Sequence, residues 1–400
     1  MVPAAQTLQA MKGMKILRSG RNRRKWIYVL LLMGLLGLSG CGSPSSASVE
    51  MSSQTELVKT GSMELQYAEN FAVDYYEDGY KMLTTLPDSK RYLLVPEGQP
   101  VPQGLDEDVS ILQEPLQNIY LVASGVMDMF ASVDAVEQIR FSGQKQENWY
   151  IQTAKDAMAA GDMIYAGKYS KPDYELLVSE GCDLAIENRM ITHSPEVVEM
   201  LQSFDIPVMI EYSSYEQHPL GKVEWVKFFG ALTGKEAKAE EAFAEQTEIL
   251  EEVESGEKTG KTIAFFYVTS NGLIQVRQST DYIPKLIELA GGRYIFENLE
   301  DSGSGRSTLN MQVEDFYAGA KDADILIYNS SIDGGVTTVD ELIGKCNILK
   351  DFKAVQEGQV YCTTNDMYQQ SMAVGYLLQD MHTVLTDDDT AKLRYLFLLQ

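Results

Sequence analysis

Residues 222–254, KVEWVKFFGALTGKEAKAEEAFAEQTEILEEVE, decide the fold of this chain. They predict two helices, 222–232 and 235–254, near the middle of the sequence. The second is rich in Ala and Glu, with apolar residues that include Ala239, Ala242, Phe243 and Ile249. An ordinary surface helix would explain the charge, but alternating strand and helix patterns flank the segment on both sides. We therefore expect a rigid connecting helix over residues 222–256.

Residues 61–221 predict an N-terminal α/β lobe. Apolar and polar residues alternate through two turns over 74–95, which indicates a β-hairpin or small meander at the start of the lobe. Beyond it, the expected strands are 119–123, 139–141, 184–187 and 207–211, and the expected helices are 126–133, 149–160 and two that begin at Pro172 and Ser194. Such alternation is typical of a parallel sheet covered by helices.

Residues 257–400 repeat this pattern and predict a C-terminal α/β lobe. The expected strands are 262–268, 325–328 and 360–363, and the expected helices are 283–290, 313–320, 369–385 and one that starts at Val339. The roughly 345 residues that could be ordered are more than one hydrophobic core normally holds. The expected fold class is α/β, with two doubly wound α/β lobes joined by a single long helix.

The first forty residues predict a lipoprotein signal peptide. A basic stretch, 21–25, precedes thirteen uncharged residues, 26–38, and this run is shorter than the roughly 18 residues that a membrane span needs. The tetrad Leu38-Ser39-Gly40-Cys41 resembles the lipobox of bacterial lipoproteins, whose Cys is acylated, for example with palmitate, and becomes the new N-terminus. We expect a lipid anchor on Cys41 at the outer face of a membrane and a flexible Ser-rich tether over 41–60.

Two alternatives remain for this leader. A plain secretory signal would also explain the short apolar run, with Cys41 in place by chance. The chain could also start at Met11 or Met14, because the ten residues before Met11 carry no charge and add nothing to the signal.

The charge balance of the mature chain is strongly acidic. All seven charged residues before Cys41 are basic, so 33 − 7 = 26 basic residues face 58 acidic ones, a formal charge of −32. Such a surface repels phosphate backbones and anionic lipid headgroups. We expect no nucleic-acid partner and regard most of these carboxylates as a solvated surface.

The chain shows no sequence pattern of a catalytic or metal site. Gly234-Lys235 is followed by Glu236, which breaks a phosphate-loop pattern, and neither Gly-x-Ser-x-Gly nor His-Glu-x-x-His occurs. The only histidines are His193, His218 and His382. They are few and scattered, so each is expected to be structural, and we expect no enzyme activity, cofactor or resident metal.

Three cysteines follow Cys41, namely Cys182, Cys346 and Cys362. Their odd number and the lack of a Cys-x-x-Cys pair argue against a disulfide scaffold. We expect buried, small apolar side chains, with a disulfide between Cys346 and Cys362 as the less favoured alternative.

Several segments together resemble one family of binding proteins. They are EYSSYEQHPLGKVEWVK at 211–227, PDYELL at 172–177 ahead of CDLAI at 182–186, and AGG at 290–292 ahead of YIF at 294–296. With the lipobox and two lobes joined by one helix, they resemble the substrate-binding lipoproteins of ABC importers for iron–siderophore complexes, haem and cobalamin. The similarity covers about residues 60–390. The stretch before Ile119 is longer than in the simplest members and has no assigned role.

The resemblance implies a ligand cleft between two lobes that move little, with the ligand held by loops at the carboxyl ends of the strands. These loops supply the candidate ligand-binding residues Tyr169, Asn188, Arg189, Met190, Ser270, Arg277, Arg306, Met367 and Tyr368. Tyr and Met suit a large flat or apolar ligand, and Arg suits carboxylate or catecholate oxygens. Three of the seven arginines after Cys41 lie in these loops, which favours an anionic ligand. For each Tyr or Met, simple burial in the core is the alternative.

The implied function is transport without catalysis. A monomer would capture an iron(III)–siderophore-type complex outside the membrane and deliver it to an ABC permease dimer with its ATPase subunits. Cobalamin and haem are alternative ligands for the same role. A cell-surface enzyme or adhesin on a similar two-lobed scaffold is the alternative class, disfavoured because catalytic patterns and repeats are missing.

The family also implies two permease-docking acids, one Glu on each lobe that pairs with an Arg pocket. The matching positions are Glu175 and Glu314, each at the start of an expected helix shortly before a strand. Ten residues separate Glu175 from Ala185, and twelve separate Glu314 from Leu326, so the two positions are equivalent in two similar lobes. The alternative is that both are ordinary first-turn acids favoured by the helix dipole.

Overall fold

The computed structural model describes residues 57–299, 307–330, 333–386 and 390–400, all within the unit Gln54–Gln400. Two predicted functional residues, Cys41 and Arg306, lie outside these ranges, as do the expected signal peptide and most of the expected tether. Within the described ranges, no helix combines the length and the apolar character that crossing a bilayer requires.

A five-stranded sheet forms the start of the described chain. Its strands are β1 (Lys59–Ser62), β2 (Phe71–Tyr76), β3 (Lys81–Thr85), β4 (Lys90–Val95) and β5 (Val109–Gln113), in this order. Neighbouring strands are antiparallel except β4 and β5, which are parallel. The meander expected over 74–95 is therefore confirmed as strands β2 to β4. The sheet also contains β1 and β5, which lie outside the predicted range.

The first lobe is built on a parallel sheet with the strand order β12-β11-β6-β7-β8. Its strands are β6 (Ile119–Leu121), β7 (Ile139–Ser142), β8 (Ile164–Tyr165), β11 (Leu184–Asn188) and β12 (Val208–Glu211), and its helices are α2 (Val126–Ser132), α3 (Gln152–Ala160), α4 (Tyr174–Ser179) and α5 (Pro195–Ser203). Helices α2 and α3 cover one face, and α4 and α5 cover the other. The predicted doubly wound arrangement is confirmed.

The helix expected to begin at Pro172 begins two residues later. Pro172 is the last residue of a small hairpin of β9 (Gly167–Lys168) and β10 (Lys171–Pro172). Gly167 has a φ of +89°, and a Cβ there would lie 2.3 Å from the carbonyl oxygen of Lys171, so the hairpin requires glycine. Asp173 then caps α4 by accepting a hydrogen bond from the N–H of Leu176 at 3.1 Å.

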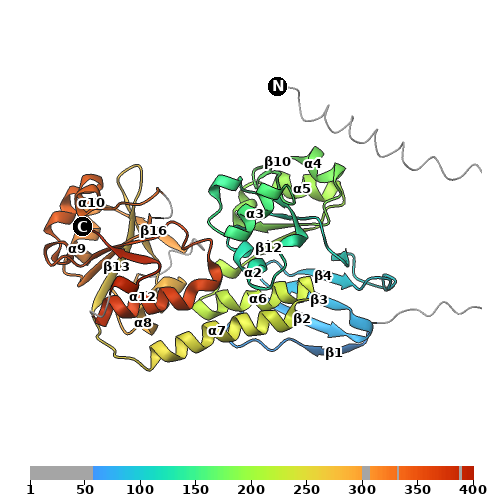
Figure 1. Cartoon of the computed structure of the whole chain (residues 1–400), viewed down its shortest axis with the longest axis horizontal. Coiled ribbons are helices and arrows are strands. Elements are labelled where there is room, and N and C mark those ends of the chain that lie inside the picture. Colours follow the sequence, from blue (N-terminus) through green and yellow to red (C-terminus); the bar gives the residue numbers. More distant parts are fainter. Residues whose placement is uncertain (1–56, 300–306, 331–332, 387–389) are drawn as a thin grey trace, which may run out of the picture. The chain divides into compact units, whose positions relative to one another are not determined.

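The connecting segment consists of two helices, α6 (Pro219–Thr233) and α7 (Glu236–Glu254), which lie side by side in Figure 1. Gly234 ends α6 in the left-handed conformation, with a φ of 69°, and the chain turns back at once. A Cβ on Gly230 would lie 2.5 Å from the Cβ of Ala239, which shows how closely the helices pack. Helix α6 is buried almost all round, whereas α7 exposes its Glu-rich face. The single long helix between the lobes is therefore α7.

The first sheet packs on α6 through aromatic rings and two buried carboxylates. Phe71 of β2 contacts the rings of Trp225 and Phe228 at centroid distances of 4.9 and 5.3 Å. Glu224 accepts hydrogen bonds from the backbone N–H groups of residues 66–68, and Glu216 accepts those of residues 69 and 70. The segment before β2 is thereby fixed to α6.

The second lobe contains a mixed sheet with the strand order β16-β14-β13-β17-β18-β19, and β15 pairs with β13. Its strands are β13 (Thr262–Val268), β14 (Ile274–Arg277), β15 (Arg293–Tyr294), β16 (Thr308–Met311), β17 (Ile325–Tyr328), β18 (Val360–Thr363) and β19 (Leu396–Leu398), and its helices are α8 (Tyr282–Leu289), α9 (Val313–Ala320), α10 (Val339–Lys345), α11 (Lys353–Gln356) and α12 (Val374–Thr386). The parallel part is covered on both faces, as predicted, by α8 and α12 and by α9 to α11. Antiparallel strands β14, β16 and β19 extend it, which the sequence analysis did not foresee.

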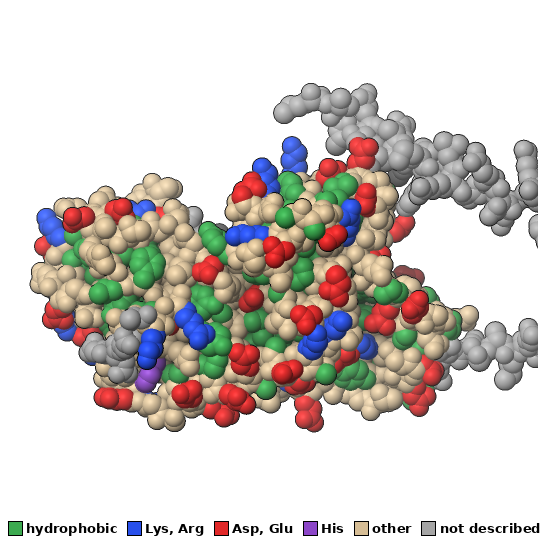
Figure 2. Space-filling view, in the orientation of Figure 1, with side chains coloured by type: hydrophobic (Ala, Val, Ile, Leu, Met, Phe, Trp, Pro, Cys, Tyr) green, Lys and Arg blue, Asp and Glu red, His purple; other side chains and the backbone are tan. Residues whose placement is uncertain are grey.

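The face of the molecule displayed in Figure 2 is acidic, as the composition predicts. Figure 2 shows Asp and Glu side chains spread over the displayed face, with fewer Lys and Arg among them.

The three cysteines within the described residues are free thiols, with Cys346 and Cys362 buried and Cys182 half-buried. The predicted burial is confirmed for Cys346 and Cys362, whereas Cys182 is only partly buried.

Candidate functional site

The carboxyl ends of the parallel strands in the first lobe share one edge of the sheet. The loops after β12, β11, β6, β7 and β8 follow one another along this edge in that order. Four large side chains stand exposed on it: Tyr215 (39%), Met190 (49%), Tyr150 (47%) and Tyr165 (40%). They are half of the eight exposed large apolar side chains in the described chain, so this edge is the chief apolar surface available to a ligand.

The predicted residues Asn188, Arg189 and Met190 lie at this edge, Asn188 as the last residue of β11 and the other two directly after it. The Asn188 side chain accepts a hydrogen bond from the N–H of Met190 at 2.9 Å and so shapes the loop. The Arg189 guanidinium lies over the ring of Tyr215, 4.5 Å from its centroid. Arg189 and Tyr215 therefore form one cationic and aromatic pair at the β11–β12 end of the edge.

Tyr169 is in a different setting, in the turn between β9 and β10. Its half-buried ring packs against the apolar cluster beneath α4 and α5. This contact fits the alternative of a core side chain better than an open ligand contact.

In the second lobe, the structure brings Arg277 and Tyr368 together. The Arg277 guanidinium donates a hydrogen bond to the Tyr368 hydroxyl and lies 3.3 Å from a carboxylate oxygen of Asp281. Asn329 also donates to the Tyr368 hydroxyl, at 3.1 Å. Burial opposes the positive charge, but Tyr368 and Asp281 outweigh it and raise the pKa of Arg277, whereas burial raises the pKa of Tyr368 to about 12. A permanent cation is thus held beside a neutral phenol.

Two other predicted residues of the second lobe, Met367 and Ser270, take no part in the hydrogen bonds that join Tyr368 to Arg277 and Asn329. Met367, next to Tyr368 in the chain, is buried. Ser270 is exposed in the turn between β13 and β14, where the N–H of Gly272 donates to the carbonyl of Thr269 at 2.9 Å.

Lys222 belongs to the same region and was missed by the sequence analysis. This residue of α6 is only 5% exposed, and its ammonium lies 4.7 Å from the ring centroid of Tyr282 in α8. Burial lowers the pKa of Lys222, while Tyr368, Glu211 and Asp281 oppose that shift. Only the tertiary fold could reveal this residue, because a lysine within a predicted helix gives no sign of burial.

The two lobes touch where the chain approaches α12. The amide of Gln369 accepts from the N–H of Tyr150 and donates to the carbonyl of Asn148, both at 2.8 Å. The N–H of Met372 donates to the carboxylate of Asp128 in α2, at 2.8 Å. Tyr368 therefore lies in a segment that rests on the strand-end loops of the first lobe.

The two predicted docking acids occupy equivalent places. Glu175 is the second residue of α4, which precedes β11, and Glu314 is the second residue of α9, which precedes β17. Both side chains are exposed. Exposure is what an ion pair with another protein requires, although it also suits a simple first-turn acid.

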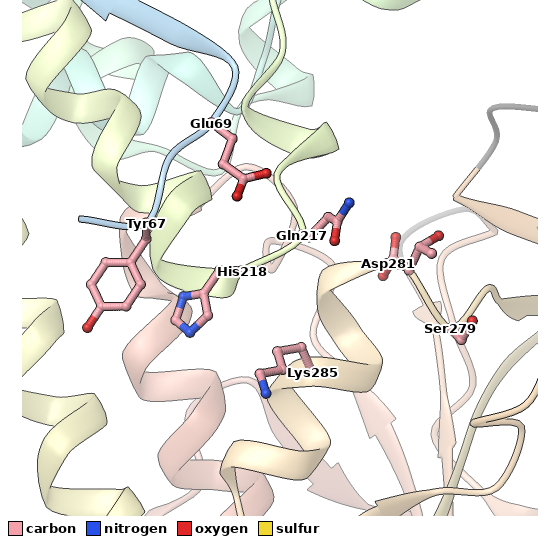
Figure 3. Close-up of a pocket in the computed structure, with 8 residues that line it drawn as sticks. Tyr67, Glu69, Gln217, His218, Ser279, Asp281 and Lys285 are labelled. Atoms are coloured by element: carbon pink, nitrogen blue, oxygen red, sulfur yellow. The ribbon is translucent and has the colours of Figure 1, made fainter. Parts of the chain in front are cut away.

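A separate pocket of about 310 Å³ lies beside the N-termini of α6 and α8 (Figure 3). It is lined by Tyr67, Glu69, Gln217, His218, Ser279, Thr280, Asp281 and Lys285. None of the predicted ligand residues lines this pocket, although Gln217 and His218 belong to the loop after β12 and Asp281 pairs with Arg277.

Comparisons with known proteins give a consistent picture. No family model matches the chain. The uncharacterized lipoprotein MJ0878 of Methanocaldococcus jannaschii is 24% identical over 396 residues, covering 90% of this chain and 92% of the relative. The uncharacterized lipoprotein MJ0872 of the same organism is 23% identical and covers 86% of this chain and 90% of the relative.

Solved structures show the fold. A possible iron-binding (periplasmic solute-binding) protein from Staphylococcus epidermidis has a TM-score of 0.53 at 16% identity, covering 67% of this chain and 98% of its own. The periplasmic haem-binding protein HutB of Vibrio cholerae has a TM-score of 0.53 at 14% identity, with the same coverage. An ABC-type Fe3+-hydroxamate transport system from Saccharomonospora viridis has a TM-score of 0.52 at 16% identity, covering 68% of this chain and 93% of its own. The chain therefore has the two-lobed α/β fold of the periplasmic solute-binding proteins that its sequence resembles.

Proposed function

We propose that this chain is the substrate-binding lipoprotein of an ABC importer and captures an iron(III)–siderophore-type complex outside the membrane. The observation that carries the proposal is the site at the lobe boundary. There the backbone N–H of Tyr150, one of the exposed residues at the strand ends of the first lobe, donates to Gln369, and the neighbouring Tyr368 accepts from Arg277.

The chemistry of this site suits such a ligand. Exposed aromatic rings offer flat apolar surfaces to the organic part of a siderophore, and Arg189 and Arg277 supply positive charge that favours its carboxylate or catecholate oxygens. The solved neighbours named for iron, haem and Fe3+-hydroxamate support a metal complex as the ligand class.

The remaining parts of the proposal concern where the protein acts. A lipid on Cys41 would hold it at the extracytoplasmic face of the cell membrane, as the lipoprotein names of the archaeal relatives support. Glu175 and Glu314 would pair with Arg pockets of the permease dimer, and the protein would act as a monomer without catalysis.

Calorimetric titration of the detergent-solubilised mature protein tests the proposal. The probes are a ferric tricatecholate, a ferric trihydroxamate, haemin and cyanocobalamin. We expect a ferric siderophore to bind most tightly, and Tyr165→Ala combined with Tyr215→Ala to weaken it at least tenfold. Leu86→Ala, which removes an equally exposed apolar side chain from the first sheet, is the matched control and should change nothing.

Two other results of the titration would change or overturn the proposal. Tighter binding of haemin or cyanocobalamin would keep the transport role and replace the ligand. If no probe bound, or if the tyrosine variant bound as well as the Leu86 control, the proposed cleft would be wrong.

A further inference from the structure

The pocket beside α6 and α8 is lined by none of the predicted ligand residues, and its walls are fixed. On one side, Glu224 holds the backbone N–H of Tyr67 at 2.8 Å, and Glu216 holds that of Glu69 at 2.9 Å. The Tyr67 ring stacks on His218, with centroids 4.4 Å apart and planes 18° from parallel. A wall held in this way loses little freedom when a ligand enters.

The opposite wall is equally well defined. Asp281 caps α8 by accepting from the N–H of Ile283 at 2.9 Å, and it also pairs with Arg277. Its carboxylate is thus already occupied. Lys285, one turn into α8, projects from this wall and pairs with Glu288 at 2.9 Å, but both side chains are well exposed, so the pair is weak and readily exchanged.

Two opposite charges therefore face one hollow from different sides. In Figure 3 the carboxylate of Glu69 lies above the pocket, and the side chain of Lys285 lies below it. Glu69 has no ion-pair partner among the residues that the structure describes. The pocket thus offers one anion and one exchangeable cation, with polar groups between them.

His218 adds a hydrogen-bond donor on the cationic side. Its Nδ1 accepts from the N–H of Leu220 at 3.2 Å, so the proton of the neutral ring is on Nε2. Burial lowers the pKa of His218, and the nearby Lys285 lowers it further, so the ring is neutral at pH 7. A neutral imidazole N–H beside an ammonium is suited to a carboxylate.

We infer that this pocket is a second binding site, for a small zwitterion of the α-amino acid type. The ligand ammonium would lie at Glu69, and the ligand carboxylate would lie at Lys285 and His218. The volume of about 310 Å³ is at the lower end of the range for small-molecule pockets, which suits an amino acid better than a siderophore. The inference rests on the pocket alone and does not depend on the proposed import function.

Calorimetric titration of the full mature protein with glycine, L-alanine, L-glutamine and L-phenylalanine tests the site, with ethylamine and propionate as probes that carry only one of the two charges. We expect at least one amino acid to bind at least tenfold more tightly than either half-probe. Glu69→Gln and Lys285→Met should each weaken that amino acid at least tenfold, with ethylamine affected only by the first and propionate only by the second.

Two controls isolate the effect. Glu64→Gln and Lys258→Met change exposed residues outside the pocket and should leave amino-acid binding unchanged. All four variants should keep the melting temperature and the affinity for a ferric siderophore, which separates this site from the cleft. The inference is overturned if no amino acid binds, if the half-probes bind as tightly, or if binding survives in both pocket variants.

Discussion

Glu187 makes a sharp prediction about how the stability of this protein depends on pH. It is the fourth residue of β11, it is fully buried, and neither of its carboxyl oxygens has a hydrogen-bond partner among the described residues. Burial therefore raises its pKa from the ordinary 4.5 to about 8. The carboxyl is protonated in the folded protein at neutral pH, whereas it is ionised in the unfolded chain.

The magnitude follows from this difference between the two pKa values, which corresponds to roughly 5 kcal/mol. Because the folded pKa is the higher one, the contribution of Glu187 is fully present below pH 4.5 and is lost as the pH rises to 8. The loss is about 1.4 kcal/mol per pH unit across this window. Water entry or relaxation around the ionised carboxylate would reduce the total, so the figure is an upper limit.

The assay is urea unfolding of the wild type and of Glu187→Gln at pH 5, 7 and 9. Gln does not titrate, so the unfolding free energy of the variant relative to the wild type should rise by about 3 to 4 kcal/mol between pH 5 and pH 9. Any fixed cost of the buried amide cancels in that comparison. Glu199→Gln, an exposed acid on α5, is the matched control and should track the wild type. Parallel curves for the wild type and Glu187→Gln would refute the reasoning.

Four further predictions can be checked directly. Cys41→Ser should abolish labelling of cells with a palmitate analogue, and a label of unchanged strength would contradict lipid anchoring. Glu175→Gln combined with Glu314→Gln should leave the melting temperature and ligand affinity intact while uptake of the iron complex falls steeply, because permease arginines lose their partners; normal uptake would leave only two first-turn acids. Tyr368→Phe should weaken ferric-siderophore binding by roughly 0.5 to 1.5 kcal/mol in a titration, the net worth of one hydrogen bond, and equal affinity would move the ligand away from Arg277. Glu224→Ala should lower the unfolding free energy by roughly 3 kcal/mol or more, because three backbone N–H groups lose their acceptor, and a loss below about 1 kcal/mol would show that water replaces it.

The parts of the fold that the sequence predicted best are those with continuous burial. The strands at 325–328 and 360–363 match β17 and β18 residue for residue, because every side chain in them is buried and the apolar run has sharp ends. Strand β1 was missed since its four residues are all exposed and show no alternation. The β13–β14 hairpin was missed although Asn271-Gly272, a common hairpin turn, marks it.

The candidate site was predictable only in part. Tyr368 lies in the loop after β18, as the strand-end rule predicts, whereas Arg277 is the last residue of β14, which runs antiparallel to β13; the structure joins the two side chains. The sequence analysis did not select Tyr165 and Tyr215, because the position of a tyrosine in the sequence does not show whether its ring points to solvent or into the core. Tyr169 illustrates the converse, since its loop position suggested a ligand contact and its ring packs against the core.

The two carboxylates that hold the segment before β2 also constrain the order in which the protein matures. Glu216 and Glu224 follow the N–H groups that they bind by 146 to 158 residues. Because the chain is synthesised from its N-terminus, residues 66–70 are made long before Glu216 and Glu224, which accept their hydrogen bonds. Closing a loop of this length is slow. The segment before β2 can be fixed only after α6 has emerged, so a part of the chain that is synthesised early is among the last to be completed.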